Sequence, residues 1–165
     1  MARSVFERLT ILVVDDSPYM LRLLSGLLGA LGVGEIVTAA DGDEAWSKFL
    51  SHRPDVVLTD AAMKPTDGFA LTRKLRAVDR RELGTVPIIM VSAHSELSAV
   101  ERARDAGISD FICKPVSART IYERLIDVVN RPREFIESAS FTGPDRRRPD
   151  DSFSEADRRG PVAFL

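Results

Sequence analysis

The stretch TILVVDDSP, residues 10–18, contains the signals that decide the fold. Four apolar residues follow Thr10 without a break, which is typical of a strand buried on both faces. Two carboxylates, Asp15 and Asp16, come next, and Ser17 and Pro18 are residue types that favour the N-cap and the first position of a helix. The stretch therefore predicts a buried strand that leads through an acidic turn into a helix.

The same alternation of a short apolar run and a longer helical segment recurs along the chain. The predicted strands are 10–14, 35–39, 55–59, 86–91 and 110–114. The predicted helices are 17–31, 42–50, 68–78, 97–106 and 117–130. Strands that alternate with helices in this way indicate a parallel sheet covered by helices on both faces. We expect an α/β domain with a five-stranded, doubly wound parallel sheet that ends near residue 130.

Composition limits the possible environments and partners. Hydrophobic residues make up 44% of the 165 residues and charged residues 29%, a balance typical of a globular protein with a buried core. The formal net charge of -2 favours neither nucleic acid nor an acidic membrane as a bulk partner. Cys113 is the only cysteine, so an internal disulfide is excluded and a reducing compartment is favoured. Without a long apolar run, the N-terminus predicts no signal peptide and no membrane insertion, so we expect a cytoplasmic protein.

Polar side chains follow four of the predicted strands and should meet at one edge of the sheet, where α/β proteins bind their ligands. They are Asp15, Asp16, Asp60, Ser92 and Lys114. Singly, each aspartate could be an ordinary turn residue or helix cap. Together, the carboxylates form an oxygen-rich site that suits Mg2+, and the ammonium could stabilise a phosphoryl group that is transferred to an aspartate.

The motifs at these strand ends resemble those of CheY-like response regulator receiver domains in two-component signalling. They are VVDDSP, LTDAAM, the dipeptide DG at 67–68, VSAH and FICKP, and they occur in the family's order and spacing. The resemblance implies a flavodoxin-like (βα)5 receiver domain over residues 8–130. The remaining residues, 131–165, form an arginine- and proline-rich tail that we expect to be flexible without a ligand.

The resemblance also implies a role for each matching residue. Asp60 would be the phosphoacceptor, and Mg2+ would be bound by Asp15, Asp16, Asp60 and the backbone carbonyl of Ala62. Ser92 and Lys114 would contact the phosphoryl oxygens. Ser92 and Phe111 would be the switch residues, which change position when Asp60 is phosphorylated. The Lys114–Pro115 peptide bond would be cis.

Two features depart from, or vary within, the family pattern near the acceptor. Lys64 separates Met63 from Pro65, where the family commonly has Met-Pro, although the spacing to the DG dipeptide is kept. Ala62 and His94 occupy the two positions that tune hydrolysis of the phosphoryl group in the family. We therefore expect a phosphorylated lifetime different from that of a chemotaxis regulator with polar residues at both positions.

The resemblance implies a single-domain response regulator rather than an enzyme. A histidine kinase or a phosphotransfer protein would phosphorylate Asp60, and a downstream protein would bind the face formed by helix 97–106, strand 110–114 and helix 117–130. No DNA-binding domain fits in the remaining residues. An aspartate-based phosphatase is a different class with an α/β fold, but the sequence has no segment for a substrate-binding cap.

The tail repeats one pattern at an offset of twelve residues: a phenylalanine, three residues, then Asp-Arg-Arg. The copies are Phe141, Asp145, Arg146 and Arg147, followed by Arg148, and Phe153, Asp157, Arg158 and Arg159. Arginine can bind phosphate and the guanine edge, phenylalanine can stack on a base, and aspartate can accept from guanine N–H groups. Two copies suit a ligand with two equivalent halves, and cyclic di-GMP fits this description.

The tail is also similar to the arginine-rich extension of CheY-like cyclic di-GMP effectors associated with flagellar motors. Two alternatives therefore stand beside a phosphorylated regulator. The chain could be a phosphorylation-independent cyclic di-GMP effector that acts on the flagellar motor or a similar partner. The tail could instead be a solvated, mobile extension without a ligand.

Overall fold

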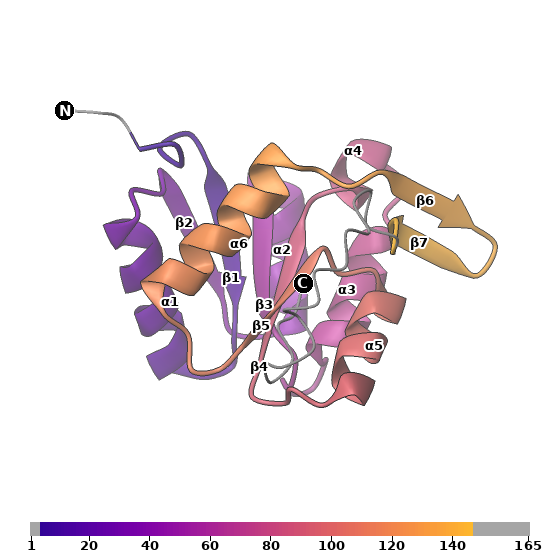
Figure 1. Ribbon diagram of the computed structural model, residues 1–165, viewed down its shortest axis with the longest axis horizontal. Helices are drawn as coiled ribbons and strands as arrows, with labels where there is room; N and C mark the ends of the chain where they lie inside the picture. Colours follow the sequence, from indigo (N-terminus) through magenta and orange to yellow (C-terminus); the bar gives the residue numbers. More distant parts are fainter. Residues whose placement is uncertain (1–3, 147–165) are drawn as a thin grey trace, which may run out of the picture.

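A five-stranded parallel sheet forms the centre of the computed structural model, which describes residues 4–146 (Figure 1). The strand order is β2-β1-β3-β4-β5. The strands are β1 (Thr10–Val14), β2 (Glu35–Ala39), β3 (Val56–Asp60), β4 (Ile88–Ser92) and β5 (Asp110–Cys113). The helices are α1 (Pro18–Ala30), α2 (Gly42–His52), α3 (Gly68–Arg76), α4 (Arg81–Gly84), α5 (Leu97–Ala106) and α6 (Ala118–Asn130). This architecture confirms the predicted doubly wound α/β fold.

The chain reverses its direction of travel across the sheet between β1 and β3. From β1 it passes outward to β2, and then returns past β1 to β3, β4 and β5. Val14 lies opposite Thr59, and Asp60 lies opposite Val91, so the carboxyl ends of β1, β3 and β4 are level. Such a switch point is where α/β sheets leave a crevice for ligands, because the neighbouring helices diverge there.

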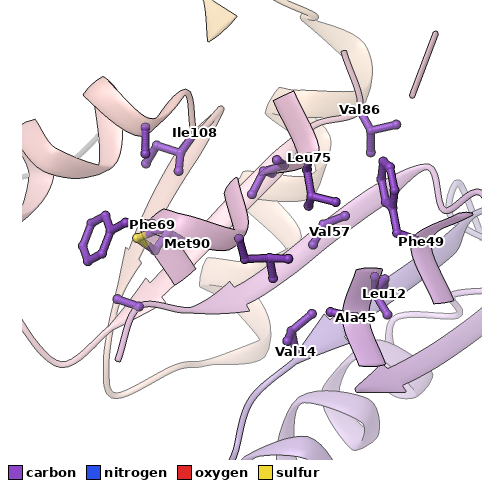
Figure 2. Packing of buried hydrophobic residues seen from close by; sticks show 14 of the residues in the cluster. Leu12, Val14, Ala45, Phe49, Val57, Phe69, Leu75, Val86, Met90 and Ile108 are labelled. Atoms are coloured by element: carbon purple, nitrogen blue, oxygen red, sulfur yellow. The ribbon is translucent and has the colours of Figure 1, made fainter. Parts of the chain in front are cut away.

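Alternate residues of each central strand face two separate hydrophobic cores. Leu12 and Val14 of β1 pack with residues of α2 and α3, including Phe49 and Leu75 (Figure 2). Ile11 and Val13 of the same strand face the other side, where α1 and α6 supply a second cluster. That cluster includes Leu24, Leu28, Ile121 and Leu125. Burial on both faces explains why β1, β3 and β4 read as uninterrupted apolar runs.

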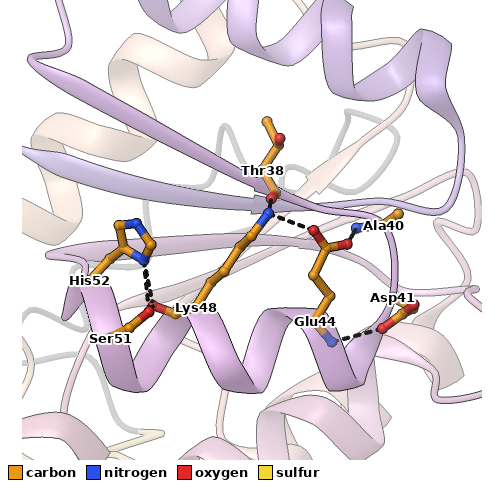
Figure 3. Close-up of polar contacts among 7 residues, drawn as sticks. All are labelled: Thr38, Ala40, Asp41, Glu44, Lys48, Ser51 and His52. Atoms are coloured by element: carbon orange, nitrogen blue, oxygen red, sulfur yellow. Dashed lines mark hydrogen bonds and ion pairs between the residues drawn. The ribbon is translucent and has the colours of Figure 1, made fainter.

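The start of α2 is closed by reciprocal capping. The carboxylate of Asp41 accepts from the Glu44 N–H at 2.8 Å, and the Glu44 carboxylate accepts from the Ala40 N–H at 2.8 Å (Figure 3). The Ala40 N–H and the Lys48 ammonium lower the pKa of Glu44. Lys48 also donates to the carbonyl of Thr38 at 2.6 Å, which ties α2 to β2. These bonds satisfy N–H groups that a helix start leaves unpaired.

The structure differs from the sequence prediction after Asn130. Two strands, β6 (Phe135–Ser138) and β7 (Phe141–Pro144), pair as an antiparallel hairpin next to the end of α5 (Figure 1). The sequence analysis assigned residues 131–165 to a flexible tail and did not predict this hairpin. Strands of four residues carry a weak sequence signal and form only a marginally stable hairpin alone, so packing on the domain stabilises them. The short helix α4 was also not predicted.

Arg76 connects this hairpin to the sheet domain. Its side chain is buried, and its Nε donates to the carbonyl of Gly107 at 2.8 Å. Its Nη1 donates to the carbonyls of Gly84 at 2.7 Å and Val86 at 2.6 Å. The Phe135 ring of β6 covers the guanidinium, with 4.9 Å between Cζ and the ring centroid. Burial lowers the pKa of Arg76 to about 9, which still leaves it charged at neutral pH.

Within residues 4–146, no helix combines the length and apolar character that a membrane crossing requires.

Replacing Arg76 with methionine should lower the free energy of unfolding by about 3 kcal/mol, because three buried carbonyls lose their donor. Urea denaturation followed by circular dichroism measures this loss. Arg73→Met, on the exposed face of the same helix, is the matched control and should change stability by less than about 0.5 kcal/mol. Equal stability of the two variants would contradict the role given to Arg76.

Candidate functional site

Four strand ends place the predicted site residues at one edge of the sheet. Asp15 directly follows β1, Asp60 ends β3, Ser92 ends β4, and Lys114 directly follows β5. The backbone N–H of Lys114 donates to the carbonyl of Ser92 at 2.8 Å, which continues the pairing of β4 and β5 beyond the last strand residue. The sequence prediction that these residues share an edge is confirmed.

Three carboxylates cluster at this edge. Asp15, Asp16 and Asp60 each offer an oxygen within 4.8 Å of the others. Asp15 is 1% exposed and Asp60 7% exposed, whereas Asp16 is open to solvent. Hard oxygen ligands with one open side suit a divalent cation such as Mg2+, which keeps several of its own waters.

The two oxygens of Asp15 have different surroundings. Oδ1 accepts from the N–H of Ser17 at 2.8 Å, whereas Oδ2 is buried and has no hydrogen-bond partner among the described residues. Burial raises the pKa of Asp15, the charge of Asp60 adds to this, and the Ser17 N–H and Lys114 oppose it. A buried carboxylate oxygen without a donor is unfavourable alone and becomes favourable next to a cation, so the residues present fit a metal ion.

Lys114 supplies the positive charge of the site. Its Nζ lies 3.1 Å from Oδ1 of Asp60 and 3.9 Å from Oδ2 of Asp15. The peptide bond between Lys114 and Pro115 is cis, as the family resemblance implied, and the bond between Lys64 and Pro65 is cis as well. The ammonium is therefore positioned where it can hold an oxygen of a group that becomes attached to Asp60.

Ser92 and Phe111 lie on the two neighbouring strands. Ser92 is 2% exposed, and its Oγ accepts from the N–H of His94 at 3.0 Å. Phe111 lies opposite Met90 and is 1% exposed, so its ring belongs to the core on the side of α2, α3 and α5. The switch roles of Ser92 and Phe111 stay predictions.

The loop after Asp60 contains a constraint that sequence reasoning missed. A Cβ on Gly68 would lie 2.1 Å from the carbonyl oxygen of Asp60, so only glycine lets the start of α3 approach the end of β3. The Gly68 N–H donates to the carbonyl of Ala61 at 3.0 Å, and Asp67 caps α3. The DG dipeptide was the available signal. Ala62 and Lys64 are exposed in this loop, and metal binding by the Ala62 carbonyl stays a prediction.

Only part of the first tail repeat lies within the described residues. The guanidinium of Arg146 stacks on the ring of Phe141, with 4.1 Å between Cζ and the ring centroid, and pairs with Asp105 at 2.9 Å. Phe141, Asp145 and Arg146 line an open hollow of about 320 Å3. The other predicted tail residues lie outside the described residues. These are Arg147, Arg148, Phe153, Asp157, Arg158 and Arg159.

Sequence comparisons point to one family. The family model of the response regulator receiver domain matches residues 11–126. A chemotaxis protein CheY homolog of Campylobacter jejuni subsp. jejuni (strain 81-176) is 36% identical over 121 residues, which cover 72% of this chain and 91% of that protein. A probable transcriptional regulator, ycf27, of Porphyridium aerugineum is 35% identical over 73% of this chain. The chain spans 48% of the length of that regulator.

Solved structures show the same similarity. The receiver domain of the Pseudomonas aeruginosa PAO1 sensor histidine kinase PA1611, with a magnesium ion in its active site cleft, is 28% identical. It matches with a TM-score of 0.67 over 74% of this chain and 98% of its own. The CheX–CheY–BeF3–Mg2+ complex of Borrelia burgdorferi matches with a TM-score of 0.67 and 29% identity over 73% of this chain and 89% of its own.

Without Mg2+, Asp15→Asn should raise the free energy of unfolding at neutral pH by about 1 kcal/mol, because it removes a buried negative charge. Such a gain in stability is expected to come with a loss of function. The folded-state pKa of Asp15 lies above its unfolded value of 3.8, so its charge is a cost at high pH. The increase in the free energy of unfolding should be complete at pH values above the folded-state pKa of Asp15 and should vanish below its unfolded-state pKa. Thermal unfolding across pH measures it.

We expect Mg2+ to raise the melting temperature of the wild-type protein. The same variant should lose this rise, because it removes one of the three carboxylates that are predicted to bind the ion. Asp43→Asn, an exposed change on α2, is the control and should keep that rise. A less stable Asp15→Asn protein at neutral pH would show that the Asp15 charge is not a cost.

Proposed function

Because the chain belongs to the response regulator receiver domain family, we propose that it is a response regulator that accepts a phosphoryl group on Asp60. A histidine kinase or a phosphotransfer protein is the donor, and the output is a protein–protein interaction. The observation that carries this proposal is the contact of the Lys114 ammonium, 3.1 Å from the Asp60 carboxylate, beside two further aspartates.

The proposed mechanism needs one nucleophile and two sources of positive charge. A carboxylate oxygen of Asp60 attacks the phosphorus, the bond to the donor's leaving group breaks, and an aspartyl phosphate forms. Asp15, Asp16 and Asp60 would hold Mg2+, which would supply positive charge next to the phosphoryl oxygens. Lys114 stabilises a further oxygen, and Ser92 donates a hydrogen bond to the attached group.

Two neighbours support the cation and the type of output. The Pseudomonas receiver domain carries magnesium in its active site cleft, and the Borrelia complex contains CheX and CheY together with BeF3 and Mg2+. For this chain we propose the face formed by α5, β5 and α6 as the surface for a downstream protein. Leu97 on α5 is 64% exposed, and such a side chain suits a protein contact.

Acetyl phosphate with Mg2+ should phosphorylate the protein once, and Asp60→Asn should abolish this, because the nucleophile is removed. Intact-mass spectrometry measures the added phosphoryl group. Asp43→Asn, a matched change at an exposed position, should be phosphorylated like the wild type. Phosphorylation that persists in Asp60→Asn, or repeated turnover of a small phosphate ester, would contradict a phosphoacceptor at Asp60.

We further propose that the chain binds cyclic di-GMP. The support is the arrangement of Phe141, Asp145 and Arg146 around the open hollow beside β7, with the guanidinium already stacked on the phenyl ring. A stacked arginine presents its second face to a nucleobase and its N–H groups to phosphate or guanine oxygens. The second copy of the repeat would bind the other half of the ligand.

Arg146→Gln should weaken cyclic di-GMP binding at least tenfold, because one charged, bidentate contact is lost. Isothermal titration of the whole chain measures the affinity. Arg104→Gln, an exposed change on α5 outside the repeat, is the control and should bind like the wild type. Equal affinity of the Arg146 variant, or no binding by the wild type, would exclude this site.

A further inference from the structure

The backbone of the β6–β7 hairpin lies directly against the C-terminal end of α5. A Cβ on Gly143 of β7 would lie 2.9 Å from Cα of Gly107, the residue that ends α5, and 2.7 Å from Cζ of the Phe141 ring in its own strand. A Cβ on Gly107 would lie 2.7 Å from the carbonyl oxygen of Thr142. Only glycines allow this approach, so the hairpin and the helix end are packed without intervening side chains.

Two side-chain contacts attach the same helix end. Arg146, just beyond β7, pairs with Asp105 in the last turn of α5 at 2.9 Å. The buried guanidinium of Arg76 donates to the Gly107 carbonyl at 2.8 Å and is covered by the Phe135 ring of β6. The end of α5 is therefore held by the hairpin strands, by an ion pair and by a guanidinium beneath it.

The opposite end of α5 leads to the phosphoacceptor edge. β4 ends at Ser92, α5 begins at Leu97, and the connecting loop contains the hydrogen bond from the His94 N–H to Ser92 Oγ. α5 has 10 residues, a length of about 15 Å, and buries Val100 and Ala103 against the core. A short packed helix moves as a unit, so a displacement of the Ser92 loop also displaces the C-terminal end of α5, which contacts the hairpin.

We propose that the docked β6–β7 hairpin restrains α5 and thereby opposes the movement of the Ser92 loop that phosphorylation of Asp60 requires. This inference rests on the proposed phosphoacceptor function. Coupling between two sites is reciprocal, so releasing the hairpin favours the phosphorylated arrangement, and phosphorylation loosens the hairpin by the same factor.

Gly143→Val tests the restraint by placing a branched side chain between β7 and α5. Gly143 lies in a strand and its φ is outside the left-handed region, so the new side chain acts through its contacts with the Phe141 ring of the hairpin and with Cα of Gly107. Glu137→Val adds the same side chain at an exposed position of β6 and is the matched control. Beryllofluoride with Mg2+, a mimic of the phosphoryl group, is titrated into both variants and the wild type by calorimetry.

Gly143→Val should bind beryllofluoride at least threefold more tightly than the wild type, and Glu137→Val should bind like the wild type. Asp105→Arg replaces the ion pair with Arg146 by a repulsion between two positive charges, and it should also tighten beryllofluoride binding. Unchanged or weaker binding in both Gly143→Val and Asp105→Arg would overturn the restraint while leaving Asp60 as acceptor. Absence of binding to the wild type would overturn both proposals.

The reciprocal measurement is hydrogen exchange of the hairpin amides in the whole chain. Beryllofluoride should increase exchange at residues 135–144 at least threefold in the wild type, because the ligand favours the released hairpin. Asp60→Asn should show no such change. Unaltered exchange in a wild-type protein that binds beryllofluoride would also overturn the restraint.

Discussion

Repulsion among three carboxylates is the constraint on which the functional edge of this protein depends. Asp15, Asp16 and Asp60 offer oxygens within 4.8 Å of one another, and two of these side chains are almost completely buried. Like charges this close raise each other's cost in a poorly solvated position. The Lys114 ammonium offsets part of that cost. The Oδ2 atom of Asp15 is buried without a hydrogen-bond donor from the described part of the chain, so a bound cation would offset the rest. The charge balance that makes the edge unfavourable without a cation is the one on which the proposed phosphoryl transfer to Asp60 depends.

A second buried charge has a different function. Arg76 lies away from this acidic edge, and its guanidinium is satisfied by the carbonyls of Gly84, Val86 and Gly107 rather than by a carboxylate. It thereby joins the end of α3, the start of β4 and the end of α5. Because the Phe135 ring covers it, the hairpin completes its enclosure. The hairpin is in this respect a part of the domain.

The sequence predicted the site more completely than it predicted the surroundings of the site. Asp15, Asp60, Ser92 and Lys114 could be located because each follows an apolar run, and parallel strands bring their carboxyl ends together. The hairpin could not be located, because four-residue strands have no clear period and are stabilised by contacts far away in the chain. For the same reason, the doubled tail pattern did not indicate that Arg146 pairs with Asp105.

The sequence by itself determined the order of strands and helices along the chain, the burial of the sheet on both faces and the identity of the acidic and basic residues at its edge. These features follow from local periodicity and from residue types that act wherever they are placed. The tertiary structure alone decided that Gly68 must lack a side chain beside Asp60, that Arg76 is buried, and that β7 rests on Gly107. These features depend on distances between segments remote in sequence, which no local pattern encodes.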